Sequence, residues 1–461
     1  MATTSVLDPE AWAEANFGSC ELGDNRRTNR AVTLAAQIAA HPDGSTPDQT
    51  ETWSDLKAAY RLFHEDDVTF QALCEPHWRL TRGRSGGVWL IIGDTTEIDF
   101  SHHRETAGLG PIGNGRGHGF LLHSALMVSA DTDEIVGLAG AELFHRKPAR
   151  KGESTHQRKQ RPRESEVWGR VIDLVGPPPD ETRFVHVLDA GADNYEVYCH
   201  LLSQRAGWVV RAAQHHRMVV DDGGPRVALN ELLPAQAVAG TYELSLRARQ
   251  GQKARTAKVE VRFAPVTMPC PHSASPWVRR YGAQAIDMWV VEVHEIGAPR
   301  GMEPLHWLLL TSEPVRTFEA AWKIIGWYEK RFLVEEYHKC LKTGCRVEAR
   351  QYAASDRLER VTGMLSILAV RLIQLKSLAR TEPERPVDEV VPRRWTQALT
   401  AIRKKGKPIQ TIRDFFRALA GLGGFLGRKG DGEPGWITIW RGLDKLILCM
   451  RGAEALAKKC G

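Results

Sequence analysis

Apolar residues in the N-terminal part of the chain recur with the spacing of amphipathic helices. This pattern predicts helices at 9–16, 26–40 and 52–64. Gly23 and Asp24 stand just before the second helix, where a turn residue and an N-cap are favoured. The beginning of the chain is therefore expected to form a small helical unit.

Farther along, short apolar runs bounded by turn residues replace the helical pattern and predict β-strands. The runs at 87–100, 119–130 and 135–144 are expected to form three antiparallel strands. Later strands are expected at 184–189, 207–211 and 305–311, and helices at 166–175 and 195–204. Strands that alternate with helices predict an α/β fold.

Strand-like alternation dominates from about 212 to 304, where the helical signal fades. We interpret this stretch as a β-rich insertion in the α/β domain. Helical patterns return at 318–325, 327–342, 357–378 and 387–461. A linker-like stretch at 380–386 precedes the last of them. We therefore expect a third, C-terminal helical unit.

The last helical stretch carries large apolar residues at helical spacing. They are Trp436, Ile439, Trp440, Leu443, Leu446 and Ile447. Two interpretations remain open for them. They form either a surface for self-association or the face that packs on neighbouring helices of the same chain.

Four polar side chains of different chemistry fall on one face of the helix expected at 327–342. At about 100° per residue, Tyr328, Arg331, Glu335 and Lys342 lie within an arc of about 60°. A solvated helix face with an Arg–Glu pair four residues apart looks the same and is common. A functional interpretation of this face depends on acidic residues elsewhere in the chain.

Two aspartates occupy matching positions after apolar runs. Asp94 and Asp189 are each expected at the carboxyl end of a buried strand, at the edge of the sheet. Taken singly, each is more simply a turn residue that ends a strand. Together with Glu335 they make the carboxylate set of a two-metal phosphoryl-transfer site, because carboxylate oxygens bind Mg²⁺.

The charge of the chain suggests its partner. The net charge is +6 and the pI is about 8.8, and the basic residues are clustered, so nucleic acid is favoured over a membrane surface. The segment 145–163 is expected to be a mobile basic loop that binds phosphates. Its basic residues are Arg146, Lys147, Arg150, Lys151, Arg158, Lys159, Arg161 and Arg163.

Three arginines, Arg26, Arg27 and Arg30, project from the first turns of the second helix. They are either DNA contacts or ordinary solvated side chains. The eight cysteines lack the spacing of zinc ligands or redox pairs. The N-terminus lacks the pattern of a secretion signal, and no window approaches 18 uncharged apolar residues. We expect a soluble intracellular protein.

The same residues belong to longer motifs that occur in order along the chain. These are Leu22-Gly23-Asp24-x-Arg26-Arg27-Thr28-x-Arg30, Asp94-Thr95-Thr96, Asp189-x-x-Ala192-Asp193, Trp307-Leu308-Leu309-Leu310-Thr311-x-Glu313-Pro314-Val315 and Tyr328-x2-Arg331-x3-Glu335-x6-Lys342. With them the chain resembles, nearly end to end, the DDE transposases of the insertion-sequence-four group. The resemblance implies a ribonuclease-H-like catalytic domain at 76–380 with the β-rich insertion, an N-terminal helical DNA-binding domain at 1–75 and a C-terminal helical dimerisation domain at 381–461.

The resemblance also assigns roles to residues. It implies that Asp94, Asp189 and Glu335 are catalytic and bind two Mg²⁺ ions, for which Mn²⁺ would substitute. The DNA contacts it implies are Arg26, Arg27, Arg30, Arg211, Trp307, Tyr328, Arg331, Phe332, Lys339 and Lys342. Trp307 would stack on a base turned out of the duplex. Phe332 stands where the family has a second tryptophan, and stacking there would be weaker.

The activity implied is cut-and-paste transposition. Hydrolysis would free a 3′ hydroxyl, this hydroxyl would form a hairpin, and the reopened end would attack target DNA. The implied partners are double-stranded element ends, target DNA and a second copy of the chain, in the bacterial cytoplasm and without a membrane. Two alternatives remain: a ribonuclease-H-like nuclease that cuts without joining, and an inactive DNA-binding remnant.

Overall fold

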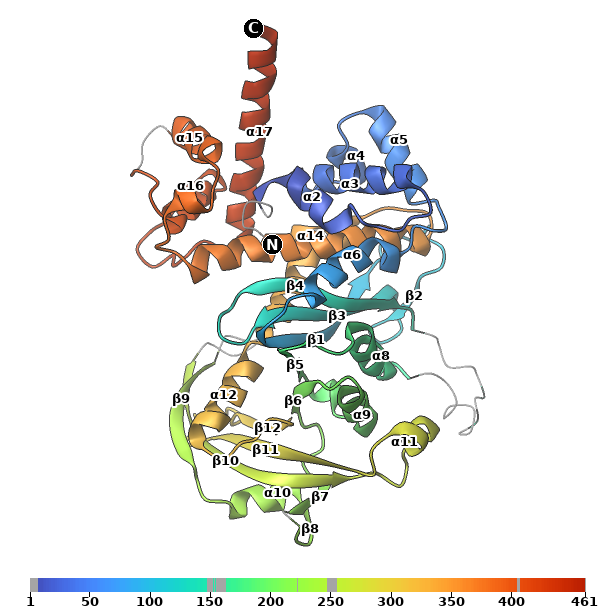
Figure 1. Ribbon diagram of the computed structural model, residues 1–461, viewed down its shortest axis with the longest axis vertical. Helices are drawn as coiled ribbons and strands as arrows, with labels where there is room; N and C mark the ends of the chain where they lie inside the picture. Colours follow the sequence, from blue (N-terminus) through green and yellow to red (C-terminus); the bar gives the residue numbers. More distant parts are fainter. Residues whose placement is uncertain are drawn as a thin grey trace.

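The computed structural model describes residues 7–146, 152, 154, 163–221, 223–246, 255–403 and 407–460, without the side chains of residue 451 and residues 454–460. Helices gather at one end of the molecule and a large mixed sheet occupies the rest (Figure 1). Helix α14 runs across the molecule between the two parts. The expected α/β class is confirmed, with helical regions from both ends of the chain.

The helices of the N-terminal region each begin at a polar capping side chain. They are α2 (Pro9–Phe17), α3 (Asn25–Ala40), α4 (Thr46–Gln49), α5 (Trp53–Leu62) and α6 (Phe70–Arg82). At the start of α3, the Asp24 carboxylate accepts a hydrogen bond of 2.7 Å from the backbone amide of Arg26. The N-cap predicted at Asp24 is therefore confirmed, and it satisfies an amide that the helix itself leaves unpaired.

The first part of the sheet combines antiparallel and parallel pairing. Its strands are β1 (Gly87–Asp99), β2 (Gly110–Ile112), β3 (Gly117–Ser129), β4 (Ile135–Phe144), β5 (Thr182–Leu188) and β6 (Gly207–Arg211). β3 pairs antiparallel with β1, β2 and β4, as the expected meander requires. β5 pairs parallel with β1 and with β6. Parallel strands need crossover connections, which α8 (Glu166–Val175) and α9 (Tyr195–Ser203) supply.

The strands of the predicted insertion extend this sheet. They are β7 (Met218–Asp221), β8 (Arg226–Ala228), β9 (Gly240–Leu246), β10 (Arg255–Pro269) and β11 (Ala285–Glu295), with the short helices α10 (Leu229–Leu232) and α11 (Pro276–Tyr281). β12 (His306–Thr311) pairs antiparallel with both β11 and β6. Among the described residues the order is therefore β2-β3-β1-β5-β6-β12-β11-β10-β7-β8, with β4 on β3 and β9 on β10.

Helices cover both faces of the sheet. α8 and α9 pack on one face, where Trp168 and Tyr198 belong to its apolar cluster. α12 (Phe318–Glu329), α13 (Phe332–Lys339) and α14 (Ser355–Thr381) pack on the other face, together with α6. The apolar cluster of this second face also includes residues of α2 and α3, so the N-terminal helices share it.

α14 is the one helix of the described residues that is long and apolar enough to cross a membrane. In the fold, 78% of its apolar window is buried, mainly against α6, β4 and other elements of the second face. Packing inside the protein therefore accounts for its apolar composition. The domain boundaries expected at residues 75 and 380 fall inside α6 and near the end of α14.

The C-terminal region consists of α15 (Arg393–Ile402), α16 (Ile412–Leu422) and α17 (Trp436–Cys460). All six of the large apolar residues predicted on the last helix are buried within the chain. Packing on neighbouring helices, the second interpretation, is thus confirmed for these side chains. The C-terminal half of α17 extends away from the other helices (Figure 1).

Candidate active site

Neighbouring parallel strands bring two predicted carboxylates and one predicted arginine to one level of the sheet. The pairing of β1 with β5, continued by two residues beyond its last pair, places Asp94 level with Asp189. The pairing of β5 with β6, continued by one residue, places Asp189 level with Arg211. Residues nearly 100 positions apart in the sequence therefore meet at the end of β5.

Asp94 does not end its strand, and the prediction that it would was wrong. β1 continues to Asp99, because β3 pairs with it as far as Gly119. Only β5, on the other side of β1, stops before this level. At Asp94, β1 is therefore paired with β3 on one side but, among the described residues, has no neighbouring strand on the β5 side. Asp94 thus lies at an edge of the sheet, as the sequence had suggested.

Asp189 caps a short 3₁₀ turn, Ala190–Ala192, with its side chain accepting a 2.7 Å hydrogen bond from the amide of Gly191. Four residues later, Asp193 is buried and accepts hydrogen bonds from the amide of Ala213 at 2.8 Å and from Arg217 at 2.5 Å. Asp193 thus fixes the loop that follows Arg211. Asp193 belongs to the motif Asp189-x-x-Ala192-Asp193, but the sequence predicted no role for it.

The helix predicted at 327–342 is interrupted, so the four polar residues do not share one continuous helix. α12 ends at Glu329, and the amides of Lys330 and Arg331 bond to carbonyls three residues back in a tight turn. Within this tight turn, Lys330 Nζ donates to carbonyls of the β3–β4 turn, which is far away in the sequence; the closest lies at 2.8 Å. α13 then gives way to a single π-helical turn, Cys340–Gly344, which carries Lys342.

Arg331 connects two of the three predicted catalytic acids. Its Nη1 lies 3.7 Å from Oδ2 of Asp94, and its Nη2 pairs with Oε1 of Glu335 one turn later. The charge of Asp189 also acts on Asp94 and on Arg331. The structure therefore brings Asp94, Asp189, Glu335 and Arg331 together.

Burial raises the pKa of Asp94 to about 6. The charge of Arg331 opposes this rise, while the charges of Asp189 and Glu335 add to it. The pKa of Tyr328 is also raised, first by burial, against the charges of Arg331 and Arg211.

The donor set fits a hard divalent cation, since three carboxylates offer only oxygen ligands. Within the described residues, however, no group of three His, Cys, Asp or Glu side chains is arranged to hold a metal ion. The guanidinium of Arg331 lies between Asp94 and Glu335 instead. Metal binding by Asp94, Asp189 and Glu335 therefore stays a prediction, supported by the chemistry of the site.

A buried histidine behind Asp94 was missed by sequence reasoning. His338 Nδ1 lies 3.8 Å from Oδ2 of Asp94, and its Nε2 lies 3.3 Å from Ser124 Oγ on β3. Burial lowers the pKa of His338 to about 3, so the ring is neutral at pH 7. His338 lies one turn after Glu335 on α13, and this spacing was the available signal.

The predicted stacking residues lie in one apolar group beside the acids. The rings of Trp307 and Tyr328 meet edge to face, with 5.2 Å between centroids, and Trp307 is 8% exposed. Phe332 is half-buried against the same cluster. Lys342 pairs with Glu348, with 3.5 Å between Nζ and Oε1, and Lys339 is exposed.

The arginines predicted to read DNA differ in their surroundings. Arg26 is exposed. Arg27 pairs with Glu65 and, at 2.8 Å, with Asp67, while Arg30 pairs with Asp55 at 2.8 Å. Arg27 and Arg30 therefore tie α3 to α5 and to the turn after α5, and sequence reasoning did not foresee these partners.

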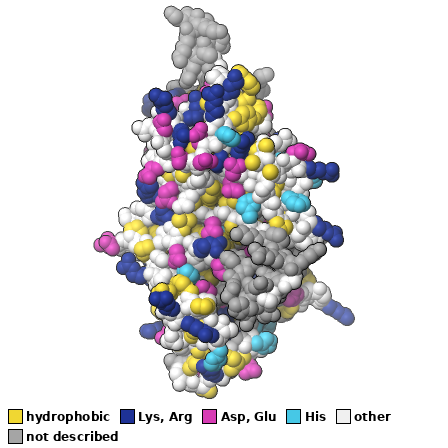
Figure 2. Space-filling model, turned by 90° about the vertical axis from the view of Figure 1, so that its right-hand side faces the viewer, with side chains coloured by type: hydrophobic (Ala, Val, Ile, Leu, Met, Phe, Trp, Pro, Cys, Tyr) yellow, Lys and Arg dark blue, Asp and Glu magenta, His cyan; other side chains and the backbone are white. Residues whose placement is uncertain are grey.

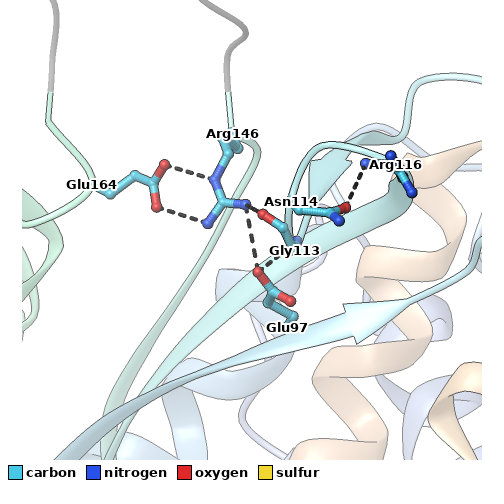
Figure 3. Close-up of polar contacts among 6 residues, drawn as sticks. All are labelled: Glu97, Gly113, Asn114, Arg116, Arg146 and Glu164. Atoms are coloured by element: carbon cyan, nitrogen blue, oxygen red, sulfur yellow. Dashed lines mark hydrogen bonds and ion pairs between the residues drawn. The ribbon is translucent and has the colours of Figure 1, made fainter.

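Most of the basic loop predicted at 145–163 lies outside the described residues. At its start, Arg146 makes two hydrogen bonds to Glu164, of 2.7 and 3.0 Å, and one of 3.1 Å to the carbonyl of Gly113 (Figure 3). Glu97 of β1 lies 3.5 Å from the same guanidinium. Arg146 thus joins the two flanks of the loop instead of presenting a free charge.

Charged side chains of both signs are mixed on the face drawn in Figure 2. Lys and Arg lie among Asp and Glu over the visible part of this face. The excess of positive charge in the sequence does not form a single-sign patch there.

Comparisons with known families identify both ends of the chain. Residues 9–68 match the model of a transposase DNA-binding domain. With the mixed sheet and its acidic site, this match supports a DNA-binding protein of the transposase class. Residues 367–459 match the model of the transposase Tn5 dimerisation domain. The two matches together support a Tn5-like transposase that binds DNA and forms a homodimer, and they flank the candidate site.

Proposed function

We propose that this protein is a cut-and-paste DNA transposase of the DDE type, in the insertion-sequence-four group. The observation that carries the proposal is the convergence of Asp94, Asp189 and Glu335 between a DNA-binding and a dimerisation domain. A ribonuclease-H-like core is proposed with it. The strand order β4-β3-β1-β5-β6, antiparallel on one side of β1 and parallel on the other, supports that core.

In the proposed mechanism, Asp94, Asp189 and Glu335 would hold two Mg²⁺ ions, or Mn²⁺ in their place. Such ions activate an attacking water or hydroxyl and stabilise the leaving 3′ oxygen. The protein itself would hold the DNA end. Arg211 and Arg331 would bind phosphates beside the acids.

Other residues would grip the DNA around the cleaved bond. Tyr328, Lys339 and Lys342 would contact its backbone, while Trp307 and Phe332 would stack on a displaced base. Arg26, Arg27 and Arg30 would contact the element end; Arg27 and Arg30 would do so only by exchanging their acidic partners for phosphate. The freed 3′ hydroxyl would form a hairpin and later join target DNA.

The decisive experiment uses labelled DNA that carries the inverted repeats flanking the coding region. With Mg²⁺ and purified protein, the proposal expects nicks at the repeat ends, hairpins and joined products. Nicks without joining would favour a ribonuclease-H-like nuclease. Binding without any cleavage, in Mg²⁺ and in Mn²⁺, would favour an inactive remnant.

Trp307→Ala is expected to reduce hairpin formation by about tenfold while first-strand nicking stays within about twofold, because stacking of one base is worth about 1–3 kcal/mol. Both products can be followed on denaturing gels. The matched control is Trp289→Ala, an aromatic on the neighbouring strand β11. Equal loss of both steps in Trp307→Ala would contradict a stacking role.

Lowering the pH from 7.5 to 5 is expected to raise the Mg²⁺ concentration for half-maximal cleavage by about tenfold. The pKa of Asp94 is about 6 without metal, so its carboxylate is mostly protonated at pH 5 and must release a proton to bind the ion. Mg²⁺ titrations at the two pH values measure the shift. An unchanged midpoint would exclude Asp94 as a ligand.

A further inference from the structure

Arg331 occupies the space between acidic groups that are proposed to bind metal. Its two terminal nitrogens face different carboxylates, Asp94 on β1 and Glu335 on α13, and the Arg331 side chain is only 20% exposed. The charge of Asp189 acts on the same guanidinium. A planar guanidinium suits this position because its terminal nitrogens can pair with two carboxylates at once.

This arrangement differs from an ordinary pair on a helix surface. A solvated Arg–Glu pair four residues apart would involve Glu335 alone. Here Arg331 also reaches a half-buried carboxylate on a separate strand. The positive charge is therefore placed where it neutralises the acids as a group.

We propose that Arg331 is the resident counter-ion of the carboxylate site and that divalent cations must displace it. This inference rests on the proposed metal role of Asp94, Asp189 and Glu335. The guanidinium and the cation would compete for the same carboxylate oxygens, and their like charges repel each other at short range.

Displacement would give Arg331 a second function. Once released from Asp94 and Glu335, its guanidinium needs another anion, and a DNA phosphate offers the same bidentate geometry. Arg331 would then be a positioning residue that couples metal loading to DNA binding, and such coupling is reciprocal. Metal would favour phosphate binding, and phosphate would favour metal binding.

The test measures binding of Mn²⁺ to the full-length protein without DNA, by electron paramagnetic resonance of the free ion. Arg331→Met keeps the aliphatic stem and removes the charge, so it is expected to bind Mn²⁺ about tenfold more tightly than the wild type. Arg331→Lys keeps the positive charge but loses the planar guanidinium. Its affinity for Mn²⁺ should therefore lie between those of Arg331→Met and the wild type. Arg183→Met is the matched control, since Arg183 pairs with Glu313 at the other end of β5 and its loss changes net charge equally.

The outcomes separate this inference from the proposed function. Tighter Mn²⁺ binding in Arg331→Met, with Arg183→Met unchanged, supports a resident counter-ion. Equal affinity in Arg331→Met and the wild type, with affinity lost in Glu335→Gln, overturns the inference and leaves the metal site intact. Absence of specific Mn²⁺ binding in all variants removes the metal site itself, and the inference with it. Circular dichroism identifies a misfolded variant, and Arg331→Lys then provides the comparison.

Discussion

Glu335→Gln is expected to reduce DNA cleavage by at least about 10³-fold while DNA binding stays within about twofold of the wild type. The amide is nearly the same size as the carboxylate but lacks the negative charge that a metal ligand needs. Because the Glu335 side chain is 55% exposed, the free energy of unfolding should change by less than about 0.5 kcal/mol. Gel assays of nicking and binding, with a urea titration, measure these quantities.

Glu336→Gln provides the control on the adjacent residue. Glu336 pairs with Lys376 of α14, so its side chain is engaged with the central helix and not with Arg331. Cleavage by this variant should remain close to that of the wild type. Near-normal cleavage by Glu335→Gln would refute its role in catalysis, whatever the control shows.

Arg371→Ala is expected to lower the free energy of unfolding by about 3 kcal/mol. Arg371 is fully buried on α14 and donates hydrogen bonds of 2.8 Å to the carbonyl of Ala39 and 2.9 Å to that of Leu7. Its guanidinium also lies over the ring of Trp12, 5.5 Å from the centroid. Burial lowers the pKa of Arg371 to about 10, so it remains charged at pH 7 and its bonds are strong.

Urea unfolding at pH 7 measures the effect of Arg371→Ala. Arg380→Ala is a suitable control, because Arg380 is exposed near the end of the same helix, and its loss should cost less than about 0.5 kcal/mol. A change below about 1 kcal/mol in Arg371→Ala would show that the N-terminal helices are held mainly by apolar packing.

Local patterns predicted the elements of this fold well. Apolar runs marked β5 and β6 within two residues of their observed limits, and the polar residue before α3 marked its cap. Asp94 and Asp189 lie at the same height in the sheet because β1 and β5 pair in parallel. The sequence suggested that the two residues occupy similar places, because each follows an apolar run. Periodicity and turn chemistry are local properties, so one sequence can reveal them.

The features that were missed depend on residues far away in the chain. The break before α13 is stabilised by carbonyls around Ala130, some 200 positions before Lys330, and helix periodicity carries no information about them. The acidic partners of Arg27 and Arg30 lie 25 to 40 residues away. An arginine paired with a carboxylate and an arginine that binds phosphate look identical in sequence.

The continuity of the sheet from β1 to β10 has a mechanical consequence. Each strand between them is joined to its neighbours by a ladder of backbone hydrogen bonds, so moving the outer strands relative to Asp189 would shear several ladders at once. If the proposed function holds, any DNA bound along those strands would lie at a set distance from Asp189. The rigid spacing of the sheet would then determine which phosphodiester reaches the acids.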